Sequence, residues 1–159
     1  METLAESRIR VPEIPRISRK IDTIIVHCSA TPEGANFNAA DIDRWHRKPP
    51  FNFRCIGYHY VVLLDGTIEL GRHIGEVGAH CAGHNKHSIG VCYIGGVRKD
   101  GRTAEDTRTQ PQKEALVALL KALKARFPTA EIRGHRDFSS KNCPSFDATK
   151  EYSFLSDNQ

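Results

Sequence analysis

Hydrophobic and polar positions along the chain predict short buried strands that alternate with helices. Residues 21–26 are mostly β-branched and apolar, which is typical of a buried strand. Residues 56–64 and 88–95 have the same character, and residues 130–133 form a shorter run of this kind. Cys92, within the third of these runs, is interpreted as a small buried hydrophobic residue. These runs supply the strands of one predicted sheet.

A hairpin signal follows the second run. Residues 65–66 are Asp-Gly, the favoured dipeptide of a two-residue hairpin turn, and another β-rich stretch covers 67–70. The hairpin makes the predicted sheet partly antiparallel. Strict alternation along the run places Tyr58 and Tyr60 on one face of the sheet and His59 on the other.

Helices are predicted from capping residues and helical spacing. Asn38 can cap a helix that runs to about residue 48. Thr109 and Gln112 have the form of a capping box at the start of a longer helix. Its apolar face consists of Leu116, Leu119, Leu120, Leu123 and Phe127. A terminal helix is expected over 146–155. Because strands and helices interleave, we predict an α/β fold: a single domain with a central mixed β-sheet flanked by helices.

The helix after Asn38 carries a histidine, His46, at helical spacing from Ile42 and Trp45. These three side chains share the inner face of the helix. That spacing already explains His46, so we interpret it as a packed or surface histidine and not as a ligand.

Length and composition fit one globular domain. The chain has 159 residues, of which 39% are hydrophobic and 26% charged. Residues 1–20 are predicted to be an N-terminal arm, because Pro12 and Pro15 oppose a helix there, and residues 21–159 form the domain. Residues 1–20 lack the apolar segment of a secretion signal, and the chain contains no apolar run that could span a bilayer. We therefore expect a protein that is cytoplasmic in the producing cell, with no membrane partner.

The net charge and the cysteine content limit the possible binding partners and indicate the redox state of the thiols. The net charge of +4 is compatible with an anionic polymer, either nucleic acid or bacterial cell wall. Lysines and arginines do not form a stripe, so nucleic-acid binding is not predicted. The five cysteines are widely spaced without a C-x-x-C pair, which favours reduced thiols over a disulfide framework.

The segment 134–147 contains several residues that could take part in binding or catalysis. His135 and Cys143 are good ligands for zinc, and Lys141 would place a cation beside them. Their spacing does not match a structural zinc knuckle and instead fits a loop whose site is completed elsewhere. A polar surface loop with a chance cysteine is the alternative that this stretch alone leaves open.

A third ligand is expected at the end of a strand. His27 follows the first apolar run and is the best candidate, whereas the next residue, Cys28, should point to the opposite face. Three protein ligands leave one position of tetrahedral zinc open, as in catalytic sites. A fourth ligand would instead make the zinc structural, and the candidates for it are His73, His80, His84 and His87.

An open zinc site would suit amide hydrolysis. Zinc lowers the pKa of a bound water towards about 7 and polarises a carbonyl group. The reaction also needs a cation for the oxyanion, which Lys141 could supply, and a group that manages the proton, for which Tyr58 is a candidate. The H-E-x-x-H helix of common metalloproteases is absent from the sequence.

Five motifs in order give the chain a family resemblance. It resembles the zinc N-acetylmuramoyl-L-alanine amidases of the phage-lysozyme and peptidoglycan-recognition-protein type. The matching stretches are Ile-Ile-Val-His-Cys-Ser-Ala-Thr, Gly-Tyr-His-Tyr with Asp-Gly-Thr after it, Val-Gly-Ala-His-Cys-Ala-Gly-His-Asn, Ser-Ile-Gly-Val-Cys-Tyr-Ile-Gly-Gly, and the loop from His135 to Pro-Ser-Phe-Asp147. They extend from residue 21 to about 147, which is nearly the whole predicted domain.

The resemblance implies a reaction, a cofactor and a set of site residues. The family's Zn²⁺ ligands correspond to His27, His135 and Cys143, its catalytic tyrosine to Tyr58, and the lysine of the phage branch to Lys141. The implied reaction hydrolyses the amide between N-acetylmuramic acid and L-alanine in peptidoglycan, as in a phage or prophage endolysin that acts on the cell wall after release. Residues that line the peptide groove of relatives correspond to His80 and Asn85, which implies muropeptide contacts there.

The residue at position 143 distinguishes this chain from some members of the family and helps to decide between possible functions. Relatives that recycle anhydro-muropeptides have Asp where this chain has Cys143, so a recycling role is disfavoured. Receptor-like relatives lack the cysteine, which favours an active enzyme here. Two rival functions remain: a non-catalytic muropeptide-binding module with structural zinc, and a protein-interaction role, since some phage relatives bind and restrain a viral RNA polymerase.

Overall fold

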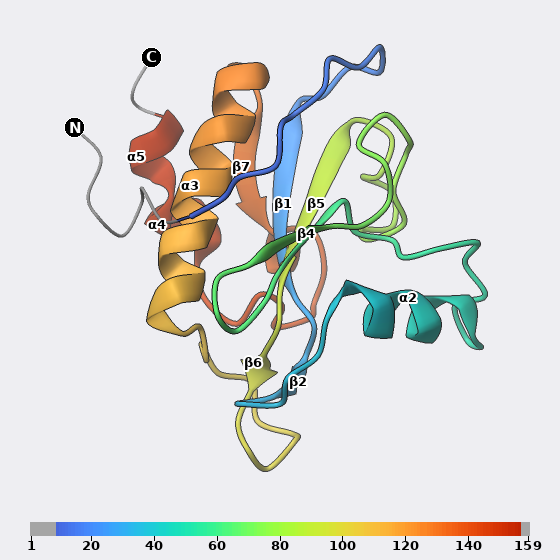
Figure 1. The fold of residues 1–159 in the computed structure, drawn as a ribbon, viewed down its shortest axis with the longest axis vertical. Coiled ribbons are helices and arrows are strands. Elements are labelled where there is room, and N and C mark those ends of the chain that lie inside the picture. The colour runs from blue at the N-terminus through green and yellow to red at the C-terminus, as the bar shows by residue number, and fades with distance from the viewer. Residues whose placement is uncertain (1–8, 157–159) are drawn as a thin grey trace.

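The computed structural model describes residues 9–156 and contains one main sheet with helices on both sides (Figure 1). In chain order the elements are β1 (Thr23–Cys28), β2 (Thr31–Pro32), α2 (Ala39–Arg47), β3 (Tyr60–Val62), β4 (Ile68–Leu70), β5 (Ser88–Tyr93), β6 (Gly96–Val97), α3 (Gln110–Arg126), β7 (Glu131–Gly134), the 3₁₀ turn η1 (His135–Asp137), α4 (Ala148–Glu151) and α5 (Ser153–Ser156). None of the helices within residues 9–156 combines the length and the hydrophobicity of a membrane-spanning segment.

The main sheet has the strand order β4-β3-β5-β1-β7. Strands β3, β5, β1 and β7 are parallel, and only β4 runs antiparallel to its neighbour β3. This confirms the predicted α/β class with a mixed sheet. Because β1 lies between β5 and β7 and is parallel to both, the residues at the carboxyl ends of these three strands lie side by side. The short strands β2 and β6, which follow β1 and β5 in the chain, pair with each other beyond these carboxyl ends.

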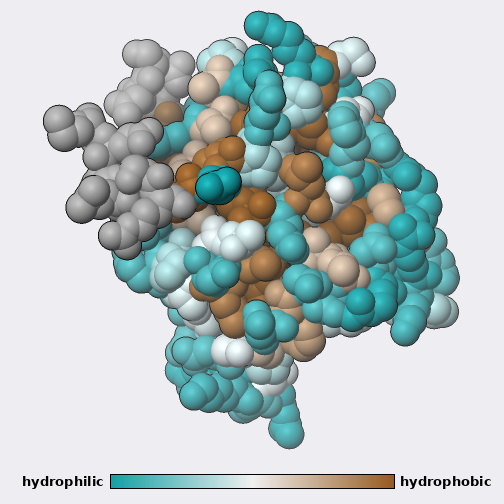
Figure 2. All heavy atoms as spheres, in the orientation of Figure 1, coloured by the Kyte–Doolittle hydropathy of each residue, from teal (hydrophilic) through white to brown (hydrophobic). Residues whose placement is uncertain are grey.

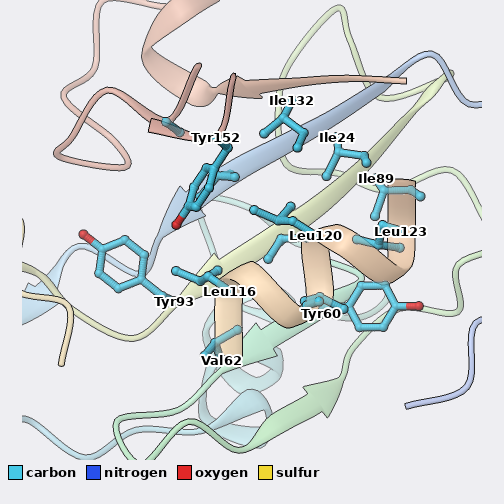
Figure 3. Packing of buried hydrophobic residues seen from close by; sticks show 14 of the residues in the cluster. Ile24, Tyr60, Val62, Ile89, Tyr93, Leu116, Leu120, Leu123, Ile132 and Tyr152 are labelled. Carbon is cyan, nitrogen blue, oxygen red and sulfur yellow. The ribbon is translucent and has the colours of Figure 1, made fainter. Parts of the chain in front are cut away.

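One face of the sheet is covered by α3, α4 and α5 and holds the larger hydrophobic core (Figure 1). Figure 3 shows Leu120 and Leu123 of α3 near Ile24 and Ile89 of the sheet, and Leu116 near Tyr93 and Val62. The capping box of Thr109 and Gln112 is formed as predicted. The helix thus begins where its sequence indicates and buries its leucines against the strands.

The opposite face of the sheet is covered by α2 and a smaller apolar cluster (Figure 1). Asn38 caps α2 and forms a capping box with Asp41, which confirms the predicted start of this helix. Ile42 of α2 packs with Val61 and Cys92 of the sheet, and both Ile42 and Cys92 are buried. The side chains that end the strands on this face form the site described below.

The segment 9–20 lies against the domain. Ile14 is buried in the core below α3, and its carbonyl oxygen accepts a hydrogen bond from Arg126 at 2.8 Å. Arg19 donates to the carbonyl oxygens of Ile74 and Ser88, each at 2.9 Å. On the side of the molecule seen in Figure 1, Figure 2 shows brown hydrophobic patches near the centre, with mostly hydrophilic residues around them. The boundary at residue 20 stays a prediction, and the first eight residues lie outside the described part of the chain.

The hairpin turn is longer than predicted. The N–H of Leu63 donates to the carbonyl of Thr67, and the N–H of Gly66 donates to the carbonyl of Leu63, so three residues separate the paired ends. Gly66 has φ +89°, the left-handed conformation that follows a type I turn in such loops. Thr109 adds a hydrogen bond from its Oγ1 to the carbonyl of Leu64, which attaches the turn to the start of α3.

Two other expectations were wrong. The chain bends at Gly57 and His59, and the regular strand begins only at Tyr60, so simple alternation fails. Tyr60 packs in the core under α3, whereas Tyr58 packs with the cluster under α2. The terminal helix is also divided, because Tyr152 leaves the helical conformation and its buried phenol accepts a hydrogen bond from Arg108.

Candidate metal centre

The site begins with His27, the penultimate residue of β1. Its side chain is fully buried and lies on the α2 face of the sheet, next to Cys92 in the register of β5. Cys28 belongs to the core of the other face, as strand alternation predicts. On the other side of β1, the pairing of Val26 with Gly134 places the start of η1 beside His27.

The loop from His135 to Cys143 is held closed by its own backbone. The N–H of Arg136 donates to the carbonyl of Cys143 at 2.7 Å, and the N–H of Gly134 donates to the Asp137 carboxylate at 2.9 Å. Beyond the loop, the Tyr93 hydroxyl donates to the carbonyl of Pro144 at 2.6 Å. These bonds return Cys143 to the end of β1, next to the residue on which the loop began.

His27, His135 and Cys143 form a group of three potential metal ligands. One ligand atom from each lies within 4.8 Å of the others. His27 Nδ1 and Cys143 Sγ are 3.9 Å apart, and two such donors on one tetrahedral zinc ion would be separated by about 3.6 Å. Two imidazole nitrogens and one thiolate are a donor set that zinc favours. The residues therefore fit the implied ion in both chemistry and spacing.

The Cys143 sulfur has a hydrogen-bond donor ready for its thiolate form. The backbone N–H of Cys28 points at Sγ from 3.1 Å. The adjacent Cys28 thiol and burial both raise the pKa of Cys143 in the metal-free protein. A metal bound here would require loss of a proton from this sulfur, and the Cys28 N–H could then donate to the thiolate.

Both histidines of the group are neutral imidazoles. Burial lowers the pKa of His27 well below its usual value, and the nearby rings of His80 and His135 lower it further. Burial also lowers the pKa of His135, with a second contribution from the charge of Lys141. A neutral imidazole has a free lone pair for a metal, so the environment keeps both rings in the ligating form.

Tyr58 lies over the group from the α2 side. Its ring centroid is 5.0 Å from that of His27. The preceding residue, Gly57, packs closely against the backbone of Ala79, because a Cβ atom there would meet the carbonyl oxygen of Ala79 at 2.0 Å. Burial raises the pKa of Tyr58 well above its usual value, with the Cys92 thiol as a further cause. The phenol therefore stays protonated and can donate a hydrogen bond.

Lys141 lies on the exposed part of the loop. Its backbone N–H donates to Ser139 Oγ at 3.2 Å. Its charge acts on both His27 and His135, whose pKa values it lowers. The ammonium group is thus the cation that accompanies the ligand group on its solvent side.

His80 and Asn85 belong to one loop beside the site but make different contacts. The side-chain oxygen of Asn85 accepts hydrogen bonds from the backbone N–H groups of His80 and Cys81, both at 2.9 Å. Asn85 thereby closes the loop that carries His80. The His80 ring is nearly buried. Its Nδ1 atom lies 2.8 Å from Nε2 of His27.

The other histidines of the described chain make contacts outside the ligand group. His84 stacks on Phe138 with ring centroids 4.2 Å apart, His73 accepts a hydrogen bond from the Gly75 N–H, and His87 faces Asp22 at 3.9 Å. His46 accepts a hydrogen bond from the Gly57 N–H at 2.9 Å, in agreement with its interpretation as a packed histidine. Among the residues described, the group thus contains three potential ligands, which on a tetrahedral ion would leave one position open.

Sequence reasoning missed the contacts that support the ligands. It expected Cys28 to point away from the site, yet the backbone N–H of Cys28 donates to Cys143 Sγ. It placed His80 in a substrate groove, without its hydrogen bond to His27. These partners lie 115 and 53 positions apart, so no local pattern could reveal them. The parallel pairing of β1 with β5 and β7 brings them together.

Comparisons with known proteins agree with this geometry. A family model described as N-acetylmuramoyl-L-alanine amidase matches residues 17–146. The endolysin of Escherichia phage T7 is 40% identical over 126 residues, which cover 79% of this chain and 82% of the endolysin. The endolysin of Klebsiella phage KP32 is 40% identical over 124 residues, which cover 78% and 80% of the two chains.

A solved structure shows the same fold. The endolysin amidase LysCS from Clostridium intestinale superposes with a TM-score of 0.74 at 24% identity, covering 92% of this chain and 97% of that one. Such a likeness concerns the fold alone, whereas the family match spans most of the chain, including both histidines and the cysteine of the ligand group. This chain therefore belongs to the N-acetylmuramoyl-L-alanine amidase family.

Proposed function

We propose that this N-acetylmuramoyl-L-alanine amidase holds a zinc ion on His27, His135 and Cys143 and uses it to hydrolyse peptidoglycan. The bond cleaved is the amide between the lactyl group of N-acetylmuramic acid and L-alanine. One observation carries the proposal. Three donors from distant parts of the chain converge at the end of β1, with spacing suited to one ion. When bound, zinc would activate a water molecule and polarise the scissile carbonyl.

The ligands would be prepared for the ion before it binds. Burial keeps the imidazoles of His27 and His135 neutral, so neither needs to lose a proton. Only Cys143 must release one, and the Cys28 N–H at 3.1 Å then donates to its thiolate. Zinc affinity should consequently increase with pH.

Tyr58 and Lys141 are proposed to stabilise the oxyanion of the tetrahedral intermediate. The protonated Tyr58 phenol beside His27 can donate a hydrogen bond, and Lys141 contributes a positive charge from the solvent side. Neither residue is a ligand in this proposal. Their removal should therefore lower the rate while leaving the bound metal in place.

The loop of His80 and Asn85 remains the proposed wall of the stem-peptide groove. The Asn85 side-chain oxygen is engaged with the loop backbone, so a substrate contact would use its amide nitrogen. The proposed substrate class is peptidoglycan and its muropeptides. Similarity to phage endolysins supports a cycle in which the enzyme is held in the cytoplasm of the producing cell and reaches the wall after release.

Digestion of purified sacculi tests the proposal. We expect stem peptides with a free L-alanine amine and intact glycan strands, identified by mass. A chelator should stop their release, and added zinc should restore it. The same products from a protein shown to be metal-free would contradict the zinc role. Stoichiometric zinc without any release of stem peptide would instead favour a non-catalytic binding module.

A further inference from the structure

The His80 ring is almost fully buried next to His27. Only 9% of its surface is exposed. Its Nδ1 lies 2.8 Å from Nε2 of His27, and its Nε2 lies 3.3 Å from the hydroxyl oxygen of Ser88. Both ring nitrogens therefore have partners within the protein. The series His27, His80, Ser88 runs from the ligand group into the interior.

Chemistry fixes the direction of the hydrogen bonds in this series. The Nδ1 atom of His27 faces Cys143 Sγ, so it must be free of a proton to bind a metal. The proton of the neutral ring is then on Nε2, which donates to His80 Nδ1. His80 must in turn carry its proton on Nε2 and donate it to Ser88 Oγ. One consistent arrangement of protons leaves Nδ1 of His27 available.

The surrounding backbone is shaped for the His80 ring. A Cβ atom at Gly90 would come within 2.7 Å of the ring, and one at Gly78 within 2.8 Å. These separations are too short for any larger residue without displacement of the imidazole. The Asn85 side chain closes the loop by accepting from the N–H of His80. Both the ring and its backbone are thus held in place from outside the ligand group.

We propose that His80 is a positioning residue, which fixes the tautomer and the ring orientation of His27 for zinc. The inference rests on the proposed zinc site but adds a role for a residue that does not ligate the ion. Acceptors that bind the second nitrogen of a ligating histidine orient the ring and increase its basicity. Here the acceptor is a neutral imidazole, and Ser88 orients it in turn.

Two amide substitutions separate the two ends of the His80 ring. In His80→Asn, the side-chain oxygen can take the place of Nδ1 and still accept from His27. In His80→Gln, the polar group reaches the position of Nε2, near Ser88, and the bond to His27 is lost. We expect His80→Asn to bind zinc almost as tightly as the unmodified protein. His80→Gln should bind it about 10- to 100-fold more weakly, as measured by competition with a chromogenic chelator.

The tautomer of His27 provides a readout independent of activity. In the metal-free protein, ¹⁵N chemical shifts of the ring should show His27 protonated on Nε2, and His80→Asn should retain this state. His80→Gln should give a mixture of tautomers. A purely structural role for His80 would change the melting temperature without changing this signature.

Several outcomes would overturn the inference. Equal zinc affinity in both variants would do so, as would an equal loss in both, because the effect would then not follow the acceptor. An unchanged tautomer in His80→Gln would also contradict it. If the unmodified protein bound no zinc, the proposed function would fail, while the tautomer measurement on the metal-free protein would still decide the positioning role.

Discussion

The two faces of the central sheet are built from different kinds of residue. The face under α3 is almost wholly aliphatic and aromatic, with Leu120 and Leu123 packed near Ile24 and Ile89 (Figure 3). On the α2 face, the strand ends carry histidine, tyrosine and cysteine side chains, which contact one another through ring packing and hydrogen bonds. Both faces are buried, but only one has the polar groups that reactions need.

This division separates stability from chemistry. Alternation along β1 sends Val26 and Cys28 to the α3 face and His27 to the α2 face. A single strand therefore contributes to both the core and the site. We expect substitutions on the α3 face to alter the free energy of unfolding, and substitutions on the α2 face to alter metal binding or rate.

The largest effect is expected on the α2 face, from Cys143→Ala. Loss of one of three ligands should leave the protein without bound zinc and lower the release of stem peptide by more than about 10³-fold, because the water is no longer activated. Metal analysis and the sacculus assay measure the two losses. Cys55→Ala, which changes a cysteine outside the ligand group, is the matched control and should retain both properties. Full activity of a metal-free Cys143→Ala protein would refute the ligand assignment.

Lys141→Ala should lower the rate without loss of the metal. Removal of one oxyanion-stabilising group lowers kcat by about 10²- to 10³-fold in comparable hydrolases. The measurements are kcat on a soluble muropeptide and zinc content on the same sample. Lys150→Ala, at an exposed position of α4, is the control and should be indistinguishable from the unmodified enzyme. An equal loss in both variants would show that only general surface charge matters.

On the α3 face, Leu120→Ala should destabilise the protein and spare the site. Leu120 is fully buried, so its truncation should cost about 3 kcal/mol in the free energy of unfolding. Denaturant titration of the metal-free protein provides the value. Leu70→Ala, at a side chain that is 64% exposed, should change it by less than about 0.5 kcal/mol. A marked loss of zinc affinity in folded Leu120→Ala would show that the two faces are not separable.

A smaller effect concerns the pH dependence of stability. Burial, with the charges of Arg19 and Arg72, lowers the pKa of His59 to about 3. The unfolded chain, with a pKa near 6.5, takes up this proton first as the pH falls, so stability is lost between about pH 6.5 and pH 3. His59→Asn should reduce the slope for the metal-free protein by up to about 1.4 kcal/mol per pH unit. An unchanged slope in His59→Asn would show that burial of this ring does not set the pH dependence.

Local signals were sufficient for much of the fold. The caps at Asn38 and Thr109 are formed by residues three positions away, so the sequence displays both partners together. The hairpin turn was predicted with two residues but has three, and one of them, Leu64, accepts a hydrogen bond from the distant Thr109 that caps α3. The terminal helix is interrupted where Tyr152 turns into the core, which no local pattern indicates.

For the site, the candidate ligands were predictable from the sequence, but the contacts that orient them were not. The resemblance named His27, His135 and Cys143, and the structure brings all three together. The supporting bonds were not predictable, because the Cys28 N–H and the His80 ring reach the ligands only through the strand order of the sheet. Ligands are recognisable by residue type, whereas the groups that orient them are recognisable only from their placement.

A crystal structure of the zinc-loaded protein, with anomalous diffraction measured at the zinc edge, tests the central claim most directly. The account predicts one strong peak at about 2.0–2.1 Å from His27 Nδ1 and from a His135 ring nitrogen, and about 2.3 Å from Cys143 Sγ. The fourth position should be occupied by solvent. A peak on other side chains, a fourth protein ligand, or the absence of a peak in a zinc-saturated crystal would contradict the account.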